Sequence, residues 1–174
     1  MRIGVVGLGY WGPNIVRNFL GNKNVARVVA CDANPKRLES TKLKFPTVET
    51  VTDYKAIIKD PSVLAVAIVT PVSSHYTLAK EALEAGKHVL IEKPMTDSVA
   101  TSEELIEIAE RKKLTLMVDH TFIYTAAVRK IKELVDRGEL GDILYFDSVR
   151  VNLGLFQHDI NVIWDLAPHD ISIM

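Results

Sequence analysis

The chain has 174 residues, of which 48% are hydrophobic and 25% are charged, and its formal net charge is −1 at pH 7. This composition predicts an ordinary globular protein, and the near-zero charge gives no electrostatic reason to expect binding to nucleic acid or to an anionic membrane. The sequence lacks a membrane-length apolar run and a signal peptide, and its single cysteine, Cys31, allows no internal disulfide. We therefore expect a cytoplasmic protein without membrane partners.

The chain opens on a short apolar run followed by three glycines. Residues 2–6 are typical of a parallel strand covered on both faces, and Gly7, Gly9 and Gly12 follow in the spacing G-x-G-x-x-G. In a dinucleotide-binding turn the first glycine permits the tight turn, the second admits a phosphate, and the third lets the next helix pack on the strand. The amides and dipole at that helix's start would then bind a pyrophosphate. Taken alone the spacing is weak evidence, because loops without a ligand also contain it.

Helices and strands are then expected to alternate along the chain. Apolar periodicity and turn residues predict helices over residues 13–20, 35–44, 54–59, 73–85 and 101–112, and strands over residues 25–31, near 48, 63–69, 88–91 and 114–118. Ser73 is expected to cap the fourth of these helices, and Gly86 to end it in a left-handed conformation. Because parallel neighbours need crossover connections, residues 1–121 are predicted to form an NAD-binding domain of the α/β class with a doubly wound parallel Rossmann sheet.

The pattern changes after residue 121. A helix over about residues 126–137, a turn at Gly138–Gly141, a longer strand from Ile143 to Asn152 and a helix from about residue 162 are predicted there. One strand does not complete a sheet, so we interpret residues 122–174 as the incomplete beginning of an α+β domain for substrate binding and oligomerisation. An unpaired strand with an exposed apolar face favours association, and we therefore expect a homo-oligomer.

Asp32 strengthens the interpretation of the glycine turn. It stands twenty residues after Gly12 at the end of the second predicted strand, where an acid is expected to accept hydrogen bonds from an adenosine ribose. A carboxylate there favours NAD over NADP, although Arg37 nearby weakens that preference. The alternative is a plain turn residue before Ala33-Asn34-Pro35. Cys31 is expected to be a small buried core residue rather than a nucleophile.

Two further turns follow predicted apolar strands. Thr70-Pro71 and Glu92-Lys93-Pro94 would lie at the carboxyl edge of the sheet, where doubly wound folds bind their ligands. This placement favours a functional Lys93, although a solvated loop lysine is the alternative. His75 is expected to line the cofactor cleft.

A second candidate pair lies near the end of the sequence. Asp165 and His169 are four residues apart and share one face if they lie on a helix, although Pro168 between them would kink a helix already formed. A plain surface pair is the alternative. The His-Asp pairs at 158–159 and 169–170 are joined by no cysteine and no second acidic cluster, so no metal site is predicted.

Taken together, these residues resemble the Gfo/Idh/MocA family, named after glucose-fructose oxidoreductase, inositol dehydrogenase and rhizopine catabolism. The resemblance covers the whole chain, and its marks are Gly7-Leu8-Gly9-Tyr10-Trp11-Gly12, Thr70-Pro71 with His75, Glu92-Lys93-Pro94, and Asp165 with His169. It implies a Rossmann oxidoreductase that transfers a hydride between a sugar hydroxyl or ketone and NAD, with NADP the less expected cofactor.

The resemblance also implies roles for individual residues. Lys93 and His169 would be the catalytic pair, with Asp165 positioning the substrate hydroxyl or the histidine. The implied cofactor contacts are Gly7, Gly9, Tyr10, Trp11, Gly12, Asp32, Arg37, Thr70, Pro71, His75, Glu92 and Lys93. Residues 152–159, continued by Asn161 and Trp164, are similar to members that act on nucleotide sugars. An arginine that many relatives carry after the sixth strand is replaced here by Ile123-Tyr124.

Two other functions stay open at this point. The same family includes dinucleotide-binding regulators without turnover, and this chain could likewise bind a dinucleotide without efficient catalysis. A methyltransferase can have a similar glycine turn and ribose-binding acid, but Glu92-Lys93-Pro94 would then have no explanation.

Overall fold

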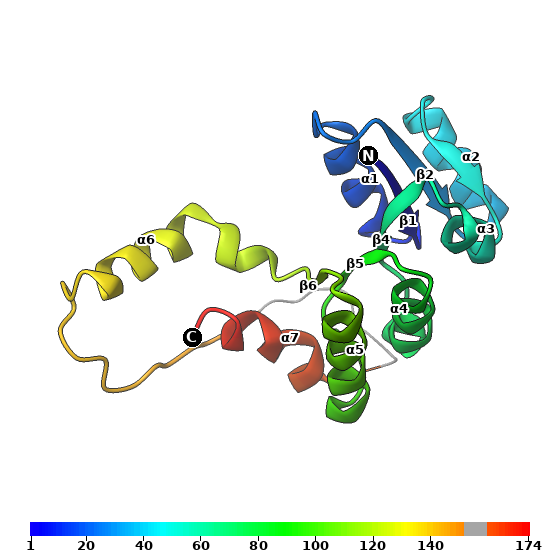
Figure 1. Cartoon of the computed structure of the whole chain (residues 1–174). Helices are drawn as coiled ribbons and strands as arrows, with labels where there is room; N and C mark the ends of the chain where they lie inside the picture. Colours follow the sequence, from blue (N-terminus) through cyan, green and yellow to red (C-terminus); the bar gives the residue numbers. More distant parts are fainter. Residues whose placement is uncertain (152–159) are drawn as a thin grey trace. The chain divides into compact units, whose positions relative to one another are not determined.

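The computed structural model describes residues 1–151 and 160–174 (Figure 1). The chain divides into two compact units, which we call unit 1 (Met1–Val118) and unit 2 (Asp119–Met174). The predicted nucleotide-sugar segment and the His-Asp pair at 158–159 fall outside the described residues. In the part that the structure describes, no helix has both the length and the apolar character needed to cross a membrane.

Unit 1 contains one parallel sheet of six strands in the order β3-β2-β1-β4-β5-β6. The strands are β1 (Arg2–Val6), β2 (Arg27–Cys31), β3 (Glu49–Val51), β4 (Val63–Ile68), β5 (His88–Ile91) and β6 (Leu116–Val118). The helices between them are α1 (Gly12–Leu20), α2 (Pro35–Lys44), α3 (Tyr54–Lys59), α4 (His75–Glu84) and α5 (Val99–Lys112). This topology confirms the predicted doubly wound α/β fold.

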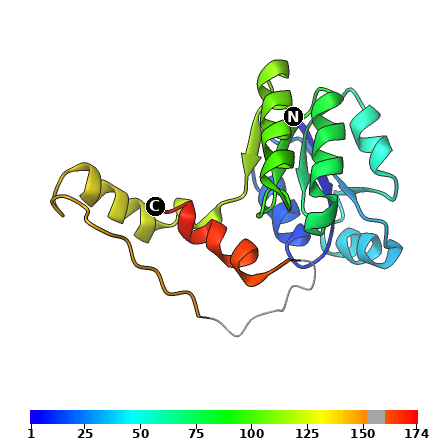
Figure 2. The same ribbon diagram turned by 90° about the horizontal axis from the view of Figure 1, so that it is seen from below.

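Helices cover both faces of this sheet, because successive strand side chains point to opposite sides. On one face Val5 and Ala30 pack with Val16 of α1 and Leu38 of α2. On the other face the neighbouring strand residues, such as Val6, pack with α3, α4 and α5. Figure 2 shows α4 and α5 side by side on that second face. The two buried layers explain why the central strands are almost continuously apolar.

The strand order reverses direction between β1 and β4. The chain leaves β1 toward β2 and β3, and it crosses back to add β4, β5 and β6 on the other side. At such a point the loops after the two central strands separate and leave a crevice at the carboxyl edge. The structure therefore places the glycine turn after β1 and the Thr70-Pro71 turn after β4 beside the position where doubly wound folds bind nucleotides.

Several helix ends differ from the sequence prediction. Ser73 does not cap α4, because Val72–Ser74 form a separate turn of 3-10 helix and α4 begins at His75. The start of α5 lies two residues earlier than predicted, at Val99, because the hydroxyl of Ser98 accepts a hydrogen bond from the Thr101 amide at 3.3 Å. Gly86 follows α4 with φ +79°, which confirms the predicted left-handed residue.

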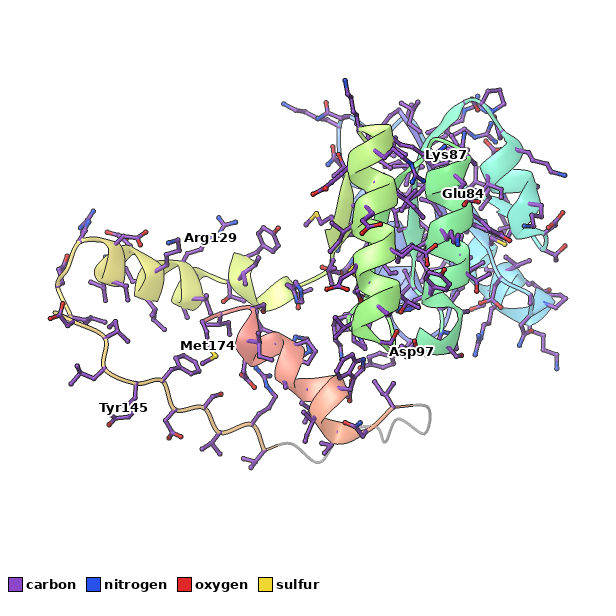
Figure 3. All side chains as sticks on the ribbon, turned by 60° about the horizontal axis from the view of Figure 1, so that its bottom comes forward. Glu84, Lys87, Asp97, Arg129, Tyr145 and Met174 are labelled. Atoms are coloured by element: carbon purple, nitrogen blue, oxygen red, sulfur yellow. The ribbon has the colours of Figure 1, made fainter. Side chains whose placement is uncertain are left out.

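Unit 2 has less regular structure. Its described elements are the 3-10 helix η2 (Thr121–Tyr124), α6 (Ala126–Asp136) and α7 (Val162–Ile171). The prediction of a strand beginning at Ile143 is wrong for the described residues 143–151, which form no strand. An extended segment forms a strand only when a neighbouring strand hydrogen-bonds to its backbone N–H and C=O groups. An apolar pattern alone is therefore not sufficient to form a strand. Figure 3 labels Tyr145 on this exposed segment.

Candidate functional site

The glycine turn requires glycine at two positions for steric reasons. Gly7 has φ +95°, and a Cβ built on it would lie 2.4 Å from the carbonyl oxygen of Val69. A Cβ on Gly12 would lie 2.1 Å from the carbonyl oxygen of Gly7. The Gly7 amide also donates a 2.8 Å hydrogen bond to the carbonyl of Cys31 on β2. The backbone of the turn thus lies close against the ends of β2 and β4, the two strands next to β1, and leaves no space for a Cβ on Gly7 or Gly12.

Gly9 differs from the other two glycines of the turn. A Cβ built on Gly9 would meet no heavy atom within 4 Å, so the protein leaves open space beside its backbone. The next helix, α1, has Trp11 as its N-cap residue, and the Trp11 side chain makes no capping hydrogen bond. An uncapped helix start beside open backbone suits an anionic ligand such as a phosphate. Tyr10 and Trp11 are exposed here and form an edge-to-face pair with ring centroids 5.7 Å apart.

Asp32 connects the glycine turn to the end of β2. The residue is only 7% exposed, and its Oδ2 accepts a 2.7 Å hydrogen bond from the Leu8 amide. Its Oδ1 accepts a 2.8 Å hydrogen bond from the Asn34 amide, which is the local turn contact of the alternative interpretation. Because a carboxylate offers about four lone-pair sites, these bonds leave capacity for a ribose hydroxyl. Both interpretations of Asp32 are therefore compatible with the same geometry.

Two neighbours of Asp32 affect the chemistry expected at this position. The Arg37 guanidinium is exposed and lies 3.5 Å from the Asp32 Oδ2. Burial, followed by the nearby charge of Asp32, raises the pKa of the Cys31 thiol from its ordinary value of 9.0 to about 11. A thiol with a raised pKa is a poor nucleophile. Cys31 is buried, which confirms the predicted core role.

The turn after β4 is held to the start of α4 by side-chain contacts. The Ser74 hydroxyl donates to the Thr70 Oγ1 at 2.7 Å. The ring of His75 is buried, and its Nε2 lies 2.8 Å from the carbonyl oxygen of Thr70. His75 is expected from the sequence to line the cofactor cleft, and in the structure its ring lies at the carboxyl edge of the sheet against the backbone carbonyls of Thr70 and Pro94.

The turn after β5 carries Lys93. The Glu92 amide donates a 3.0 Å hydrogen bond to the carbonyl of Ile68 on β4, which keeps the two turns adjacent. The Lys93 amide lies 3.1 Å from the Glu92 Oε2, the Lys93–Pro94 peptide bond is cis, and Lys93 is half-buried. Unit 1 therefore brings together at one sheet edge the glycine turn, Asp32, Thr70-Pro71 and Lys93.

The second predicted pair lies in unit 2. Asp165 and His169 are both half-buried on α7, one helical turn apart, and α7 continues through Pro168 to Ile171. The His169 ring packs edge-on against the ring of Phe122, with centroids 4.8 Å apart. The structure thus confirms that Asp165 and His169 share a helix.

A further contact in unit 2 was missed by the sequence analysis. The Arg150 guanidinium lies over the Phe122 ring, 4.7 Å from its centroid, and forms a two-pronged ion pair with Asp170 at 2.8 and 3.1 Å. Its hydrogen bonds hold the pKa of Asp170 below the ordinary value of 3.8. Arg150 and Asp170 are twenty positions apart, and the sequence between them follows no pattern from which this contact could be predicted. Among the described residues no group of three potential metal ligands is found.

Comparison with known proteins identifies relatives of the chain. The model of the GFO_IDH_MocA family, described as an oxidoreductase family with an NAD-binding Rossmann fold, matches residues 1–120. The sequence is 32% identical to a 1-carboxy-3-chloro-3,4-dihydroxycyclohexa-1,5-diene dehydrogenase of Comamonas testosteroni, over 100% of this chain and 46% of that protein. It is 31% identical to a UDP-N-acetylglucosamine 3-dehydrogenase of Acidithiobacillus ferrooxidans, over 99% of this chain and 53% of that protein.

Solved structures give the same family. A scyllo-inositol dehydrogenase from Lactobacillus casei, with bound NAD(H) and scyllo-inositol, is similar with a TM-score of 0.75 and 27% sequence identity. The similarity covers 82% of this chain and 42% of that one. The chain thus spans about half the length of the relatives that it matches.

Proposed function

The chain belongs to the GFO_IDH_MocA family of oxidoreductases, and from this premise we propose that it takes part in hydride transfer between NAD and a sugar or nucleotide sugar. The observation that carries the proposal is the edge of unit 1, where the open backbone of Gly9, the carboxylate of Asp32 and the turn of Lys93 follow β1, β2 and β5 of one parallel sheet. This edge carries the open glycine backbone, the uncapped helix start and the carboxylate that dinucleotide-binding sites of doubly wound folds use.

The glycine turn would bind the pyrophosphate of the cofactor. The open space at Gly9 admits a phosphate, and the backbone amides at the start of α1 supply donors for its oxygens. Asp32 would accept hydrogen bonds from the adenosine ribose. Its carboxylate disfavours a 2′-phosphate, and we propose NAD as the cofactor, although the nearby cation of Arg37 would favour NADP. Further cofactor contacts proposed are Tyr10, Trp11, Thr70, Pro71 and Glu92, whereas the ring nitrogens of His75 contact the backbone carbonyls of Thr70 and Pro94.

Lys93, His169 and Asp165 would handle the substrate hydroxyl. The cofactor, when bound, supplies the hydride acceptor or donor. As the alcohol is oxidised, its proton must leave, and we propose that the imidazole of His169 accepts it. Lys93 would share that proton or polarise the developing carbonyl, and Asp165 would orient the histidine or the hydroxyl. The assignment of His169 and Asp165 follows the family pattern, since these two residues belong to unit 2.

Replacement of Lys93 tests this proposal. Lys93→Met is expected to leave NADH binding largely intact, because the glycine turn and Asp32 would supply most of the cofactor contacts. Turnover should fall by at least about a hundredfold, because the ammonium would act on the reacting hydroxyl of the substrate. Fluorescence titration with NADH and NADPH measures binding, and NADH formation with a panel of inositols and UDP-sugars measures turnover. Near-normal turnover of the variant would contradict the role of Lys93.

One observation favours a second function, which is dinucleotide binding without efficient catalysis. No described residue of unit 2 is buried, whereas unit 1 has a complete core. On this alternative the wild-type chain binds NADH with micromolar affinity and shows no turnover on any member of the panel. Turnover that depends on His169, measured with His169→Ala, would exclude the alternative.

We further propose that the chain self-associates through the exposed apolar residues of segment 143–151. Ile143, Leu144, Tyr145, Phe146, Val149 and Val151 are all exposed. Contiguous exposed apolar side chains of this kind mark interaction surfaces. Light scattering is expected to show an oligomer whose mass falls in Leu144→Lys, and a monomeric wild-type chain would contradict the proposal.

A further inference from the structure

His75 is the first residue of α4 and one of the most buried polar residues of unit 1, with 1% of its surface exposed. Its two ring nitrogens contact two different turns. The Nε2 lies 2.8 Å from the carbonyl oxygen of Thr70, and the Nδ1 lies 3.0 Å from the carbonyl oxygen of Pro94. Thr70 lies after β4 and Pro94 after β5, which are neighbouring strands. The imidazole therefore bridges two turns of the candidate site.

Both of these partners are acceptors. A carbonyl oxygen accepts hydrogen bonds and cannot donate, so each contact requires an N–H group on the imidazole. A ring with hydrogens on both nitrogens satisfies both carbonyls, whereas a neutral ring satisfies one. In either state the ring atoms that could bind a cofactor face the protein backbone. This geometry differs from that of a side chain that lines an open cleft.

The consequence concerns Lys93. Pro94 follows Lys93 directly, so a hydrogen bond to the Pro94 carbonyl restrains the backbone that carries the lysine. Ser74, the neighbour of His75, donates to the Thr70 Oγ1 at 2.7 Å or to the Pro71 carbonyl at 2.8 Å, which holds the other turn to the same helix start. Ser74 and His75, where the 3-10 turn meets α4, thus contact both turns.

We propose that His75 is a positioning residue, which fixes the Lys93-Pro94 turn relative to the Thr70-Pro71 turn and so sets where the Lys93 ammonium meets the substrate. The catalytic meaning of this placement rests on the proposed function. The bridge between the turns does not, because it concerns the protein alone. Misplacement of a reacting group by about 1 Å is enough to lower a rate about a hundredfold.

Three variants test the proposal. His75→Phe keeps a planar ring and removes both donors, and His75→Gln keeps an amide nitrogen that can donate. Leu83→Ala is the matched control, because Leu83 is fully buried on the same helix and is not among the residues of either turn. Amide hydrogen exchange over residues 70–74 and 92–97 is compared with global unfolding in urea for each variant.

We expect His75→Phe to raise exchange in both segments by about tenfold more than its loss of global stability explains, as for the loss of one hydrogen bond. His75→Gln should restore part of the protection, and Leu83→Ala should show no excess in these segments. If His75→Phe raises exchange evenly over unit 1, as Leu83→Ala does, the histidine is an ordinary core residue and the proposal is overturned. Weaker NADH binding with both turns unchanged would overturn it in favour of a direct cofactor contact.

Turnover separates this inference from the proposed function. We expect His75→Phe to lower kcat by about ten- to a hundredfold with the Kd for NADH within about twofold of wild type. His75→Phe can show the expected excess exchange in both turns while Lys93→Met keeps full activity. That result would contradict the proposed function and would establish the bridge by His75.

Discussion

Unit 1 and unit 2 differ most in how much side-chain surface they bury. All of the buried residues in the described part of the chain belong to unit 1, on the two faces of its sheet. In unit 2 the described apolar side chains of α6 and of segment 143–151 are largely exposed. The candidate cofactor residues thus rest on a complete core, whereas Asp165 and His169 rest on a helix with no buried residue. We therefore expect the candidate binding edge of unit 1 and the helix that carries Asp165 and His169 to differ in stability.

The largest effect that sharpens this contrast is expected at the glycine turn. Gly12→Val places a Cβ 2.1 Å from the Gly7 carbonyl oxygen. The backbone must shift to relieve this clash. We therefore expect the free energy of unfolding of unit 1 to fall by about 3 kcal/mol or more and NADH binding to disappear. Urea unfolding followed by Trp11 fluorescence in a Trp164→Phe background measures the loss.

Gly9→Ala is the matched variant for that experiment. A methyl group on Gly9 meets no protein atom within 4 Å. We expect its effect on stability to stay below about 1 kcal/mol. Binding of NADH should weaken about tenfold, because the methyl group occupies the space proposed for a phosphate. Equal losses of stability in the two variants would contradict the steric argument.

The next effect compares one apolar residue from each unit. Ile68 is fully buried in β4, whereas Ile131 on α6 is 52% exposed. Ile68→Ala is expected to lower the free energy of unfolding by about 2–5 kcal/mol, because it leaves a cavity. Ile131→Ala is expected to lower it by less than about 0.5 kcal/mol. Similar losses in both variants, measured by urea unfolding with circular dichroism, would show that unit 2 also buries a core in solution and would break the comparison.

The smallest effect concerns the ion pair of unit 2. Hydrogen bonds from Arg150 lower the pKa of Asp170 below its ordinary value of 3.8. Because the carboxyl pKa is lower in the folded state than in the unfolded state, the pair contributes its full stability above pH 3.8. This stability is lost as the pH falls through the lower pKa of the folded state. We therefore expect Trp164 fluorescence to report a small acid transition below pH 3.8 in the wild-type chain.

Asp170→Asn and Arg150→Gln are both expected to remove that transition, because each variant lacks one member of the pair. Both side chains are only partly buried, so the change in stability at neutral pH should be slight. An unchanged acid transition in both variants would assign it to another group.

The sequence predicted most of unit 1 because local chemistry and long-range structure agree there. The glycine spacing, Asp32 and the alternation of apolar runs with helical segments each indicate a parallel sheet, and β5 and α3 begin and end at the residues predicted. The predicted strand from Ile143 failed for residues 143–151, because an apolar pattern forms a strand only when another strand pairs with it.

Local sequence by itself determined which turns lie at the carboxyl edge of the sheet, because the loop that follows each parallel strand begins at that edge. Only the tertiary structure decided what the side chains at that edge contact. The Val69 carbonyl leaves no space for a side chain on Gly7, His75 faces two backbone carbonyls, and Arg150 pairs with Asp170. Apart from the contact of His75 with Thr70, these contacts join residues far apart in the chain, and hydrogen-bond geometry depends on distances in space that residue spacing does not encode.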